Sequence, residues 1–175
     1  MKHISIVFQD TNLFKMSVAE NVAMYKPGAS REEIMEALRQ ARCEDILEKL
    51  PNGVDSVIGA RGVYLSGGEM QRIALARAIL KDAPIVLLDE ATAFADAENE
   101  YLIQRALDIL LHGKTVLMIA HRLQTIVHAD QIIVMQRGGI AEQGTHEELM
   151  QRQGVYAKMY HEYENSVSWK IGGWA

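Results

Sequence analysis

The stretch LSGGEMQR at residues 65–72, followed by IVLLDE at residues 85–90, decides the fold of this chain. Ser66 is a typical N-cap, and the small and apolar residues after it predict a helix that runs to about Lys81. Four consecutive apolar residues at 85–88 are typical of a parallel strand that is buried on both faces. A helix followed at once by such a strand indicates an α/β architecture.

The segments on either side extend this alternation of strands and helices. Ile4–Phe8 and Val116–Ala120 are short apolar runs that predict two further buried strands. Ala97–Leu111 has helical spacing, and we expect four of its side chains to face inward: Leu102, Ala106, Ile109 and Leu110. The chain order is one strand, a helical block and then βαβ units, which predicts an α/β fold with a helical insertion.

Short-range signals define the ends of other elements. The triplet Arg137-Gly138-Gly139 lies between two apolar runs, at residues 132–135 and 140–142, and predicts a β-hairpin. Residues 166–175 have no period, so we expect a disordered tail there. Two capping boxes predict helix starts: Ser30 with Glu33, and Thr145 with Glu148.

The composition excludes several classes of protein. The 175 residues carry a net charge of -5, which argues against a nucleic-acid binder that relies on phosphate contacts. No apolar run approaches the ~20 residues needed to span a bilayer. The single cysteine, Cys43, excludes an internal disulfide and fits a reducing, cytoplasmic compartment. We interpret Cys43 as a small core or surface thiol rather than a nucleophile.

Two groups of residues indicate chemistry. Asp89 and Glu90 follow the strand at residues 85–88, and ligands bind at the carboxyl edge of a parallel sheet. There Asp89 would hold Mg²⁺, and Glu90 would activate a water molecule as a general base. Ser66-Gly67-Gly68 at a helix N-terminus would bind a phosphate through free amides. Each short pattern also has a purely structural explanation: acids are favoured at a helix N-terminus, and Ser-Gly-Gly is a simple N-cap.

The longer pattern resembles a known family. The run from residue 65 through Arg72, continued by ALARA at residues 74–78, resembles the signature of ABC transporters. Residues 85–90 resemble the Walker B strand with its catalytic glutamate, and Glu69 stands where the family often has Gln. The resemblance runs from about residue 4 to about residue 163. It implies the ATP-binding domain of an exporter-type ABC transporter, an ATPase that uses ATP and Mg²⁺.

Further positions fit the same family in the expected order. Gln9 resembles the Q-loop glutamine, Asp96 the D-loop aspartate and His121 the H-switch histidine, and residues 59–62 resemble the loop that precedes the signature in exporters. The resemblance thereby implies three sets of site residues. The catalytic residues would be Glu90 and His121; the nucleotide-binding residues would be Gln9, Ser66, Gly67, Gly68, Glu69 and Asp96; the metal ligands would be Asp89 and Gln9.

The fold implied by this family is an α/β, P-loop NTPase-like parallel sheet core, here incomplete, with an inserted α-helical signature subdomain. Residues 1–165 would form this partial ABC ATPase domain. Residues 1–15 would supply a core strand and the Q-loop, residues 16–82 the helical subdomain with the signature, and residues 83–165 the core with Walker B, D-loop and H-switch.

The phosphate loop of such a domain reads Gly-x4-Gly-Lys-Ser/Thr, and the 175 residues do not contain it. Gly113-Lys114-Thr115 has Asp108 in place of the earlier glycine, and it precedes a strand where the loop should follow one. We interpret it as a turn between a helix and a strand. We therefore expect an N-terminal truncation between the phosphate loop and the Q-loop, and we expect the chain alone to be inactive as an ATPase.

The resemblance also implies partners and a location. A second ABC ATPase domain would join head to tail, and a transmembrane domain would bind through the Q-loop region, at the cytoplasmic face of the cell membrane. Nucleic acid is not an expected partner. One alternative is a non-catalytic, degenerate subunit that supplies only its signature face to a complete partner. Another is a soluble ABC protein that acts on DNA or ribosomes, which the acidic balance disfavours.

Overall fold

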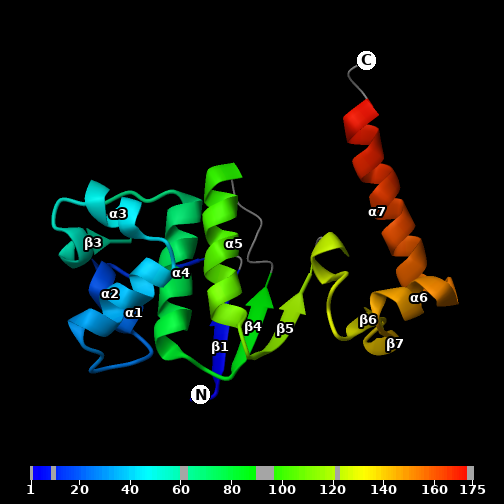
Figure 1. Ribbon diagram of the computed structural model, residues 1–175, viewed down its shortest axis with the longest axis horizontal. Coiled ribbons are helices and arrows are strands. Elements are labelled where there is room, and N and C mark those ends of the chain that lie inside the picture. The colour runs from blue at the N-terminus through cyan, green and yellow to red at the C-terminus, as the bar shows by residue number, and fades with distance from the viewer. Residues whose placement is uncertain (1, 9–10, 60–62, 90–96, 121–122, 173–175) are drawn as a thin grey trace. The chain divides into compact units, whose positions relative to one another are not determined.

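The computed structural model describes residues 2–8, 11–59, 63–89, 97–120 and 123–172, and the chain divides into two compact units. The first unit is Met1–Ile119 and the second is Ala120–Ala175 (Figure 1). Each unit has its own hydrophobic core. Four of the expected site residues lie outside the described residues: Gln9, Glu90, Asp96 and His121.

A three-stranded parallel sheet lies at the centre of the first unit. Its strands are β1 (Ile4–Val7), β4 (Ile85–Asp89) and β5 (Thr115–Ile119), in the order β1-β4-β5. The register pairs Ile4 with Ile85 and Ile85 with Thr115, so the carboxyl ends of the three strands meet at one edge. With the helices around it, this sheet confirms the predicted α/β fold.

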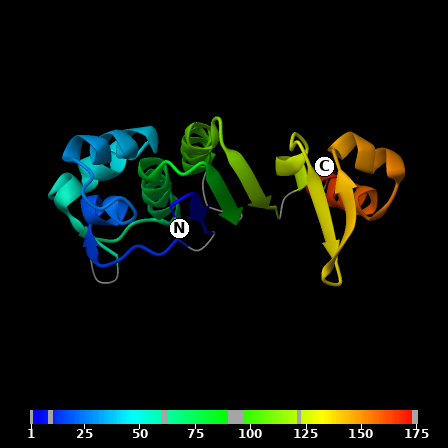
Figure 2. The ribbon, with the colours of Figure 1, turned by 90° about the horizontal axis from the view of Figure 1, so that it is seen from below.

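Two helices pack against this sheet. α4 (Gly67–Lys81) and α5 (Ala97–Leu111) lie side by side in both views of the ribbon (Figures 1 and 2). They share one core with the buried, alternating side chains of β1 and β4, among them Val7, Val86 and Leu88. The sheet therefore has one covered face.

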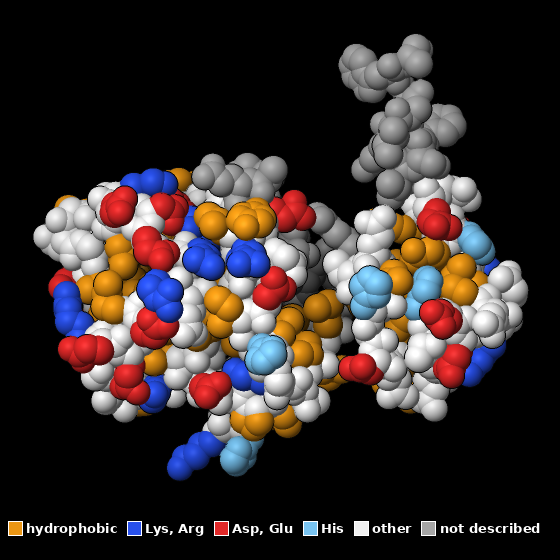
Figure 3. Space-filling view, viewed as in Figure 1, with side chains coloured by type: hydrophobic (Ala, Val, Ile, Leu, Met, Phe, Trp, Pro, Cys, Tyr) orange, Lys and Arg blue, Asp and Glu red, His pale blue; other side chains and the backbone are white. Residues whose placement is uncertain are grey.

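The prediction of burial on both faces for residues 85–88 is wrong, and so is the prediction that residues 116–120 form a buried strand. Burial alternates along β1 and β4, and every residue of β5 is exposed. Leu117 and Ile119 are each 60% exposed, and Figure 3 shows hydrophobic side chains gathering over this part of the first unit. The physical reason is that the helices cover one face of β1 and β4 only, so that neither face of β5 is covered, and no element in the described parts of the chain pairs with its outer edge.

The inward side of α5 also differs from the prediction. The buried residues of this helix are Ile103, Ala106, Leu107 and Leu110. Ile109 is 39% exposed instead of inward. The stripe at positions i, i+3, i+4 and i+7 from Ile103 faces α4, and this places Ile109 on the outer side of the helix.

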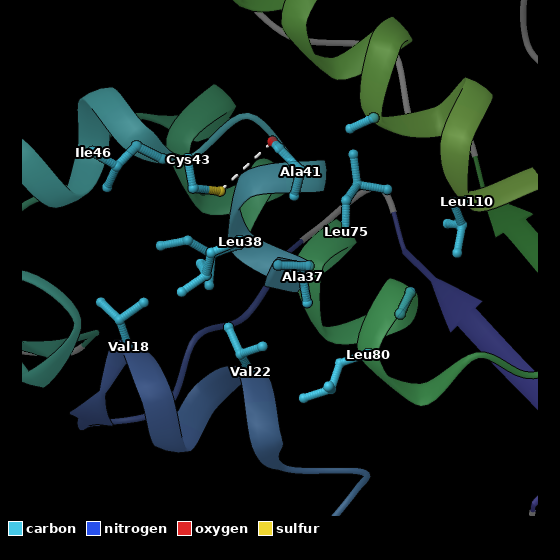
Figure 4. Close-up of a cluster of buried hydrophobic side chains, with 14 of the residues drawn as sticks. Val18, Val22, Ala37, Leu38, Ala41, Cys43, Ile46, Leu75, Leu80 and Leu110 are labelled. Atoms are coloured by element: carbon cyan, nitrogen blue, oxygen red, sulfur yellow. Dashed lines mark hydrogen bonds between the residues drawn. The ribbon is translucent and has the colours of Figure 1, made fainter. Parts of the chain in front are cut away.

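The elements between β1 and α4 are mostly helices, as predicted. Figure 4 shows the core of this segment, in which Val18, Leu38 and Leu75 of α4 belong to one buried cluster. Cys43 is fully buried there, and this burial raises the pKa of its thiol, so Cys43 is a core thiol. The elements are β2 (Met16–Ser17), α1 (Val18–Ala23), α2 (Arg31–Gln40), α3 (Glu44–Lys49), the 3-10 helix η1 (Gly53–Asp55) and β3 (Val57–Ile58), with β2 and β3 antiparallel.

The second unit is a β-hairpin with two helices. The predicted hairpin is confirmed, because β6 and β7 are antiparallel and Arg137 and Gly138 at the turn both have positive φ. The Glu142 carboxylate accepts hydrogen bonds of 2.9 Å from the amides of Val155 and Tyr156, and so caps the last helix. The elements are η2 (Leu123–Ile126), β6 (Ile132–Gln136), β7 (Gly139–Gly144), α6 (His146–Arg152) and α7 (Val155–Gly172).

Helix α7 continues past the expected start of the disordered tail. Residues 166–172 are helical where we expected an irregular segment. A helix whose first turn is already held, here by Glu142, gains one hydrogen bond for each further residue, and this favours its extension without a periodic apolar pattern.

The local signals for turns and caps are confirmed. Ser30 and Thr145 each accept from the N3 amide in a capping box, and a third box at Ser17 with Glu20 was not predicted. Gly113, with φ of +69°, lies in the turn between α5 and β5, and the Lys114 ammonium pairs with the Asp82 carboxylate at 2.9 Å. The Gly-Lys-Thr triplet is thus a turn that precedes a strand.

Candidate functional site

The first turn of α4 carries four of the expected site residues, Ser66, Gly67, Gly68 and Glu69, which we call the signature face. Ser66 is the N-cap, with φ of −66° and ψ of 162°. Its Oγ accepts from the amide of Glu69 at 3.3 Å, and the Glu69 carboxylate accepts from the amide of Ser66 at 2.8 Å. This reciprocal pair is a capping box, so the predicted helix start is confirmed.

Gly67 and Gly68 are the first two residues of α4, between the two members of this capping box. Amides of the first helical turn have no acceptor within their own helix, and they point toward the positive end of the helix dipole. Ser66 and Gly67 are partly exposed, so a ligand can reach this end of α4. The arrangement can accept a phosphate group through main-chain donors and the Ser66 hydroxyl.

Gly68 has a second, structural role. A Cβ added at this position would lie 2.8 Å from Cγ and 2.9 Å from Cβ of Asn99, which is on α5. Such distances are shorter than side chains tolerate, so α4 and α5 approach closely only because residue 68 is a glycine. The sequence pattern attributed both glycines to ligand access, whereas Gly68 is buried against Asn99.

Helix α3 holds the signature face from the side. The Lys49 ammonium lies 3.2 Å from the Glu69 carboxylate. One turn earlier on α3, the Asp45 carboxylate receives two hydrogen bonds from the guanidinium of Arg72, at 2.6 and 2.9 Å. Arg72 is 1% exposed, so this bidentate pair fixes the second turn of α4 from inside the protein.

The charge of Glu69 is balanced locally. Partial burial by itself raises the pKa of this carboxyl, but the amide of Ser66, the Lys49 ammonium and the Ser66 hydroxyl together lower the pKa below its usual value. Glu69 is therefore ionised at neutral pH. The Glu69 carboxylate accepts from Lys49 and from the amide of Ser66, so the amides of Gly67 and Gly68 are not among its hydrogen-bond partners.

Asp89 ends β4 at the carboxyl edge of the sheet. It is partly exposed and pairs in register with Ile119, the last residue of β5. A single carboxylate fits Mg²⁺, which takes one or two carboxylates and keeps several waters. Glu90 follows Asp89 in the chain, and the strands that precede Gln9 and His121 end at the same edge, although these three residues lie outside the described ones.

The signature helix is also tied to the segment after Gln9. Asn21 is fully buried, and its side-chain amide accepts from the main chain of Phe14 and donates to the carbonyls of Phe14 and Ser17. Arg77 of α4 donates to the Asn21 carbonyl at 2.8 Å and to its Oδ1 at 3.2 Å. The contacts of Arg77 with Asn21, like those of Asp45 and Lys49 with α4, were not predicted, because each joins residues that are 20 or more positions apart in the chain.

A cavity of about 500 Å³ opens beside this segment. Its walls combine apolar side chains with two cations, Arg77 and Lys81, which lie 5.9 and 5.0 Å from the ring centre of Tyr25. Ser5 and Thr11 also line the cavity, and their hydroxyl oxygens are buried and make no hydrogen bond to any residue that the structure describes. Ile6, Phe8 and Phe14 supply the apolar part, and all three are exposed.

Comparison with known proteins places these features in a family. Residues 1–93 match the model of the ABC transporter family. The chain is 52% identical over 159 residues to an ATP-dependent lipid A-core flippase of Legionella pneumophila (strain Lens), covering 91% of the chain and 27% of that protein. It is also 52% identical over 159 residues to the mycobactin import ATP-binding/permease protein IrtA of Mycolicibacterium smegmatis, covering 18% of that protein.

A solved structure agrees with the sequence comparison. The structure of a bacterial Atm1-family ABC exporter with ATP bound superposes with a TM-score of 0.81 at 42% identity, covering 92% of this chain and 28% of that one. The chain thus spans about a quarter or less of the length of the relatives named here. Within its described residues, no helix combines the length and the apolar character that a bilayer crossing requires.

Proposed function

The chain belongs to the ABC transporter family, and on that premise we propose that it is part of the ATP-hydrolysing domain of an exporter-type transporter, whose turnover drives transport across a membrane. The observation that carries the proposal is the signature face. Its capping box leaves the amides of Gly67 and Gly68 at the positive end of α4, next to a partly exposed Ser66 hydroxyl.

In this proposal the signature face binds the terminal phosphate of an ATP molecule that a second ABC domain holds. Asp89 and Gln9 would hold Mg²⁺, which would neutralise charge on the transferring phosphoryl group. Glu90 would take a proton from the attacking water as general base, and His121 would contact the terminal phosphate. Asp96 would contribute to the interface between the two nucleotide sites.

We also propose that a transmembrane domain docks at the segment that follows Gln9. The cavity beside β1 supports this, because Phe8, Phe14 and Tyr25 expose apolar surface where Arg77 and Lys81 supply charge. Arg77 also contacts Asn21, so movement at this cavity would reach α4 directly. The chain would then work at the cytoplasmic face of a membrane.

A substitution at the N-cap tests the signature face. The 175-residue chain is mixed with a complete ABC ATPase domain whose own hydrolysis is blocked, and ATP-dependent association is followed by analytical ultracentrifugation. Ser66→Arg should abolish association, because its bulk occupies the place of the phosphate. Ser30→Arg is the matched control: Ser30 is also an N-cap in a capping box, so it loses the same cap, but it should leave association intact. Equal association of both variants would overturn the proposal.

A second candidate is a non-catalytic subunit that only completes the site of a partner. The observation that favours it is the signature face itself, because Ser66, Gly67 and Gly68 at the start of α4 could serve a partner's nucleotide without any catalytic residue of this chain. Mg²⁺-dependent phosphate release by the purified chain can decide against this second candidate. We expect none above background. Release that Glu90→Gln abolishes would eliminate the non-catalytic candidate and would show that the chain binds the triphosphate by itself.

A further inference from the structure

A second hollow of the first unit, distant in the sequence from the signature face, gathers positive charge. Its volume is about 390 Å³, and it is lined by Arg42, Arg105, Asp108, Ile109 and His112. Four of these residues come from α5 and the residue after it, at the spacing i, i+3, i+4 and i+7 that places them on one side of the helix. This is the outer side of α5, opposite its buried stripe.

Arg42 reaches the hollow from the turn between α2 and α3. Its φ is +58°, a left-handed conformation that costs a non-glycine residue about 1 kcal/mol or more. The conformation is held on both sides, because the Arg42 amide donates to the Arg39 carbonyl at 3.0 Å and its own carbonyl accepts from the buried Arg72. The backbone of Arg42, from which its side chain extends, is therefore held in place.

The two guanidinium groups of the hollow have no partner in the described parts of the chain. The side chains of Arg42 and Arg105 take part in no hydrogen bond, ion pair or ring contact there, whereas most other described arginine side chains are paired: Arg31 with Asp55, Arg39 with Glu36, Arg72 with Asp45, Arg77 with Asn21 and Arg152 with Gln143. Asp108, the only carboxylate of the lining, accepts instead from Gln104 at 3.2 Å. The hollow thus carries two arginines against one carboxylate, an excess of positive charge in a chain of net charge -5.

We propose that this hollow binds a phosphate ester of a small polyol. Planar guanidinium groups match the oxygens of a phosphate in two-point hydrogen bonds, and His112 adds a further nitrogen donor. Asp108 can accept a hydroxyl hydrogen of the organic part, and Ile109 offers apolar surface. The volume lies in the range of small-ligand sites and exceeds the need of inorganic phosphate alone. The site is independent of the proposed transport activity, since it shares no residue with the signature face or Asp89.

Calorimetric titration of the 175-residue chain with glycerol 3-phosphate tests the proposal. We expect saturable binding that weakens about tenfold or more in Arg42→Gly and in Arg105→Gln, because each removes a charge-assisted hydrogen bond. Arg42→Gly suits the left-handed backbone at this position, so its loss of binding cannot be attributed to misfolding. Arg137→Gln is the matched control, since Arg137 lies at the hairpin turn of the second unit and its side chain has no partner among the residues that the structure describes.

Two further arms identify the source of the ligand and locate its site. Cosedimentation with phosphatidylcholine vesicles, with and without phosphatidic acid, shows whether a lipid headgroup can supply the ester; vesicle binding that Arg42→Gly removes supports a lipid source, and its absence alongside soluble binding supports a free ester. No saturable binding of either probe would overturn the proposal. So would binding that Arg42→Gly and Arg105→Gln leave unchanged, or that Arg137→Gln weakens equally.

Discussion

Arg77 of the signature helix donates from Nε to the main-chain oxygen of Asn21 at 2.8 Å, which joins α4 to the segment that follows Gln9. The contact lies in the partly buried interior, where a guanidinium keeps its place only if its donors are satisfied. Any displacement of residues 14–21 must therefore be followed by α4 or must break this bond. The signature face and the cavity beside β1 are thus connected through α4, to which Arg77 ties Asn21.

Replacement of Asn21 by leucine should destabilise the chain by about 3 kcal/mol. The change keeps the volume but leaves the Phe14 amide and one Arg77 donor without their acceptor, and each unsatisfied buried group costs about 1–3 kcal/mol. Urea unfolding followed by circular dichroism measures the effect. Asn52→Ala, at an exposed position whose side chain makes no cap, should leave the midpoint in place. A loss below 1 kcal/mol in Asn21→Leu would argue against this network.

Gly68→Ala should lower stability by about 1–3 kcal/mol, because the new Cβ meets Asn99 at 2.8 Å and must push α5 away from α4. Thermal unfolding of the chain checks this. Gly139→Ala serves as the control, since the nearest atom to its Cβ would be 3.9 Å away and its backbone is accessible to alanine. Equal melting temperatures for the two variants would contradict the close packing of α4 and α5.

The pair of Asp45 with Arg72 predicts a dependence of stability on pH. The hydrogen bonds from Arg72 lower the pKa of Asp45 from its usual 3.8. Because the pKa of Asp45 is lower in the folded state than in the unfolded state, the pair contributes its full amount to the free energy of unfolding above pH 3.8. This contribution is lost as the pH falls through the lower pKa of the folded state.

Asp45→Asn should remove this part of the acid dependence and lower the free energy of unfolding by about 2 kcal/mol at neutral pH, a value reduced by the partial exposure of Asp45. Arg72→Met should cost less, because it leaves no unpaired charge inside. A larger loss in Arg72→Met than in Asp45→Asn would contradict this order.

The edge strand β5 should make the chain bind hydrophobic dyes. Its apolar side chains are exposed, and an unpaired strand edge invites association with other strands. Leu117→Lys should reduce dye fluorescence and concentration-dependent association without lowering the melting temperature. Tyr64→Lys, at a position 90% exposed but away from β5, is the control and should change neither. A monodisperse chain that does not bind the dye would contradict the prediction that β5 exposes an apolar, association-prone surface.

In the complete transporter, Glu90→Gln should trap bound ATP and nearly stop turnover, because it removes the proposed general base. His121→Ala should do likewise by losing a contact to the terminal phosphate. ATP hydrolysis and retention of labelled nucleotide measure both effects. Normal turnover in the two variants would refute these catalytic assignments.

Local rules predicted much of this fold. The N-caps at Ser30, Ser66 and Thr145 and the turn at Gly138 depend on neighbours within a few residues, so the sequence displays them directly. The exposure of β5 was not predictable in this way, because burial depends on which other segments cover a strand and not on its own apolar residues.

In the candidate site, too, features that depend on nearby residues were predicted, and features that depend on distant segments were not. The signature face was predicted by its motif, and its capped helix start is confirmed at Ser66. The support from Asp45 and Lys49 was not, because ion pairs between α3 and α4 join residues that only the fold brings together. The contact of Asn99 with Gly68 was not predicted for the same reason, because it depends on how closely α4 and α5 pack.

The parallel pairing of β1 with β4 has a consequence for the order in which this protein folds. Ile4 must find Ile85 across the whole helical segment, and closing so long a loop has an entropic cost that rises with its length. If residues 16–82 first collapse around Val18, Leu38 and Leu75, the ends of that loop approach each other before the sheet forms. Helices with local contacts form fast, whereas distant strand pairs form late. In refolding experiments, helical circular dichroism should therefore recover before the amides of β1 gain protection from hydrogen exchange.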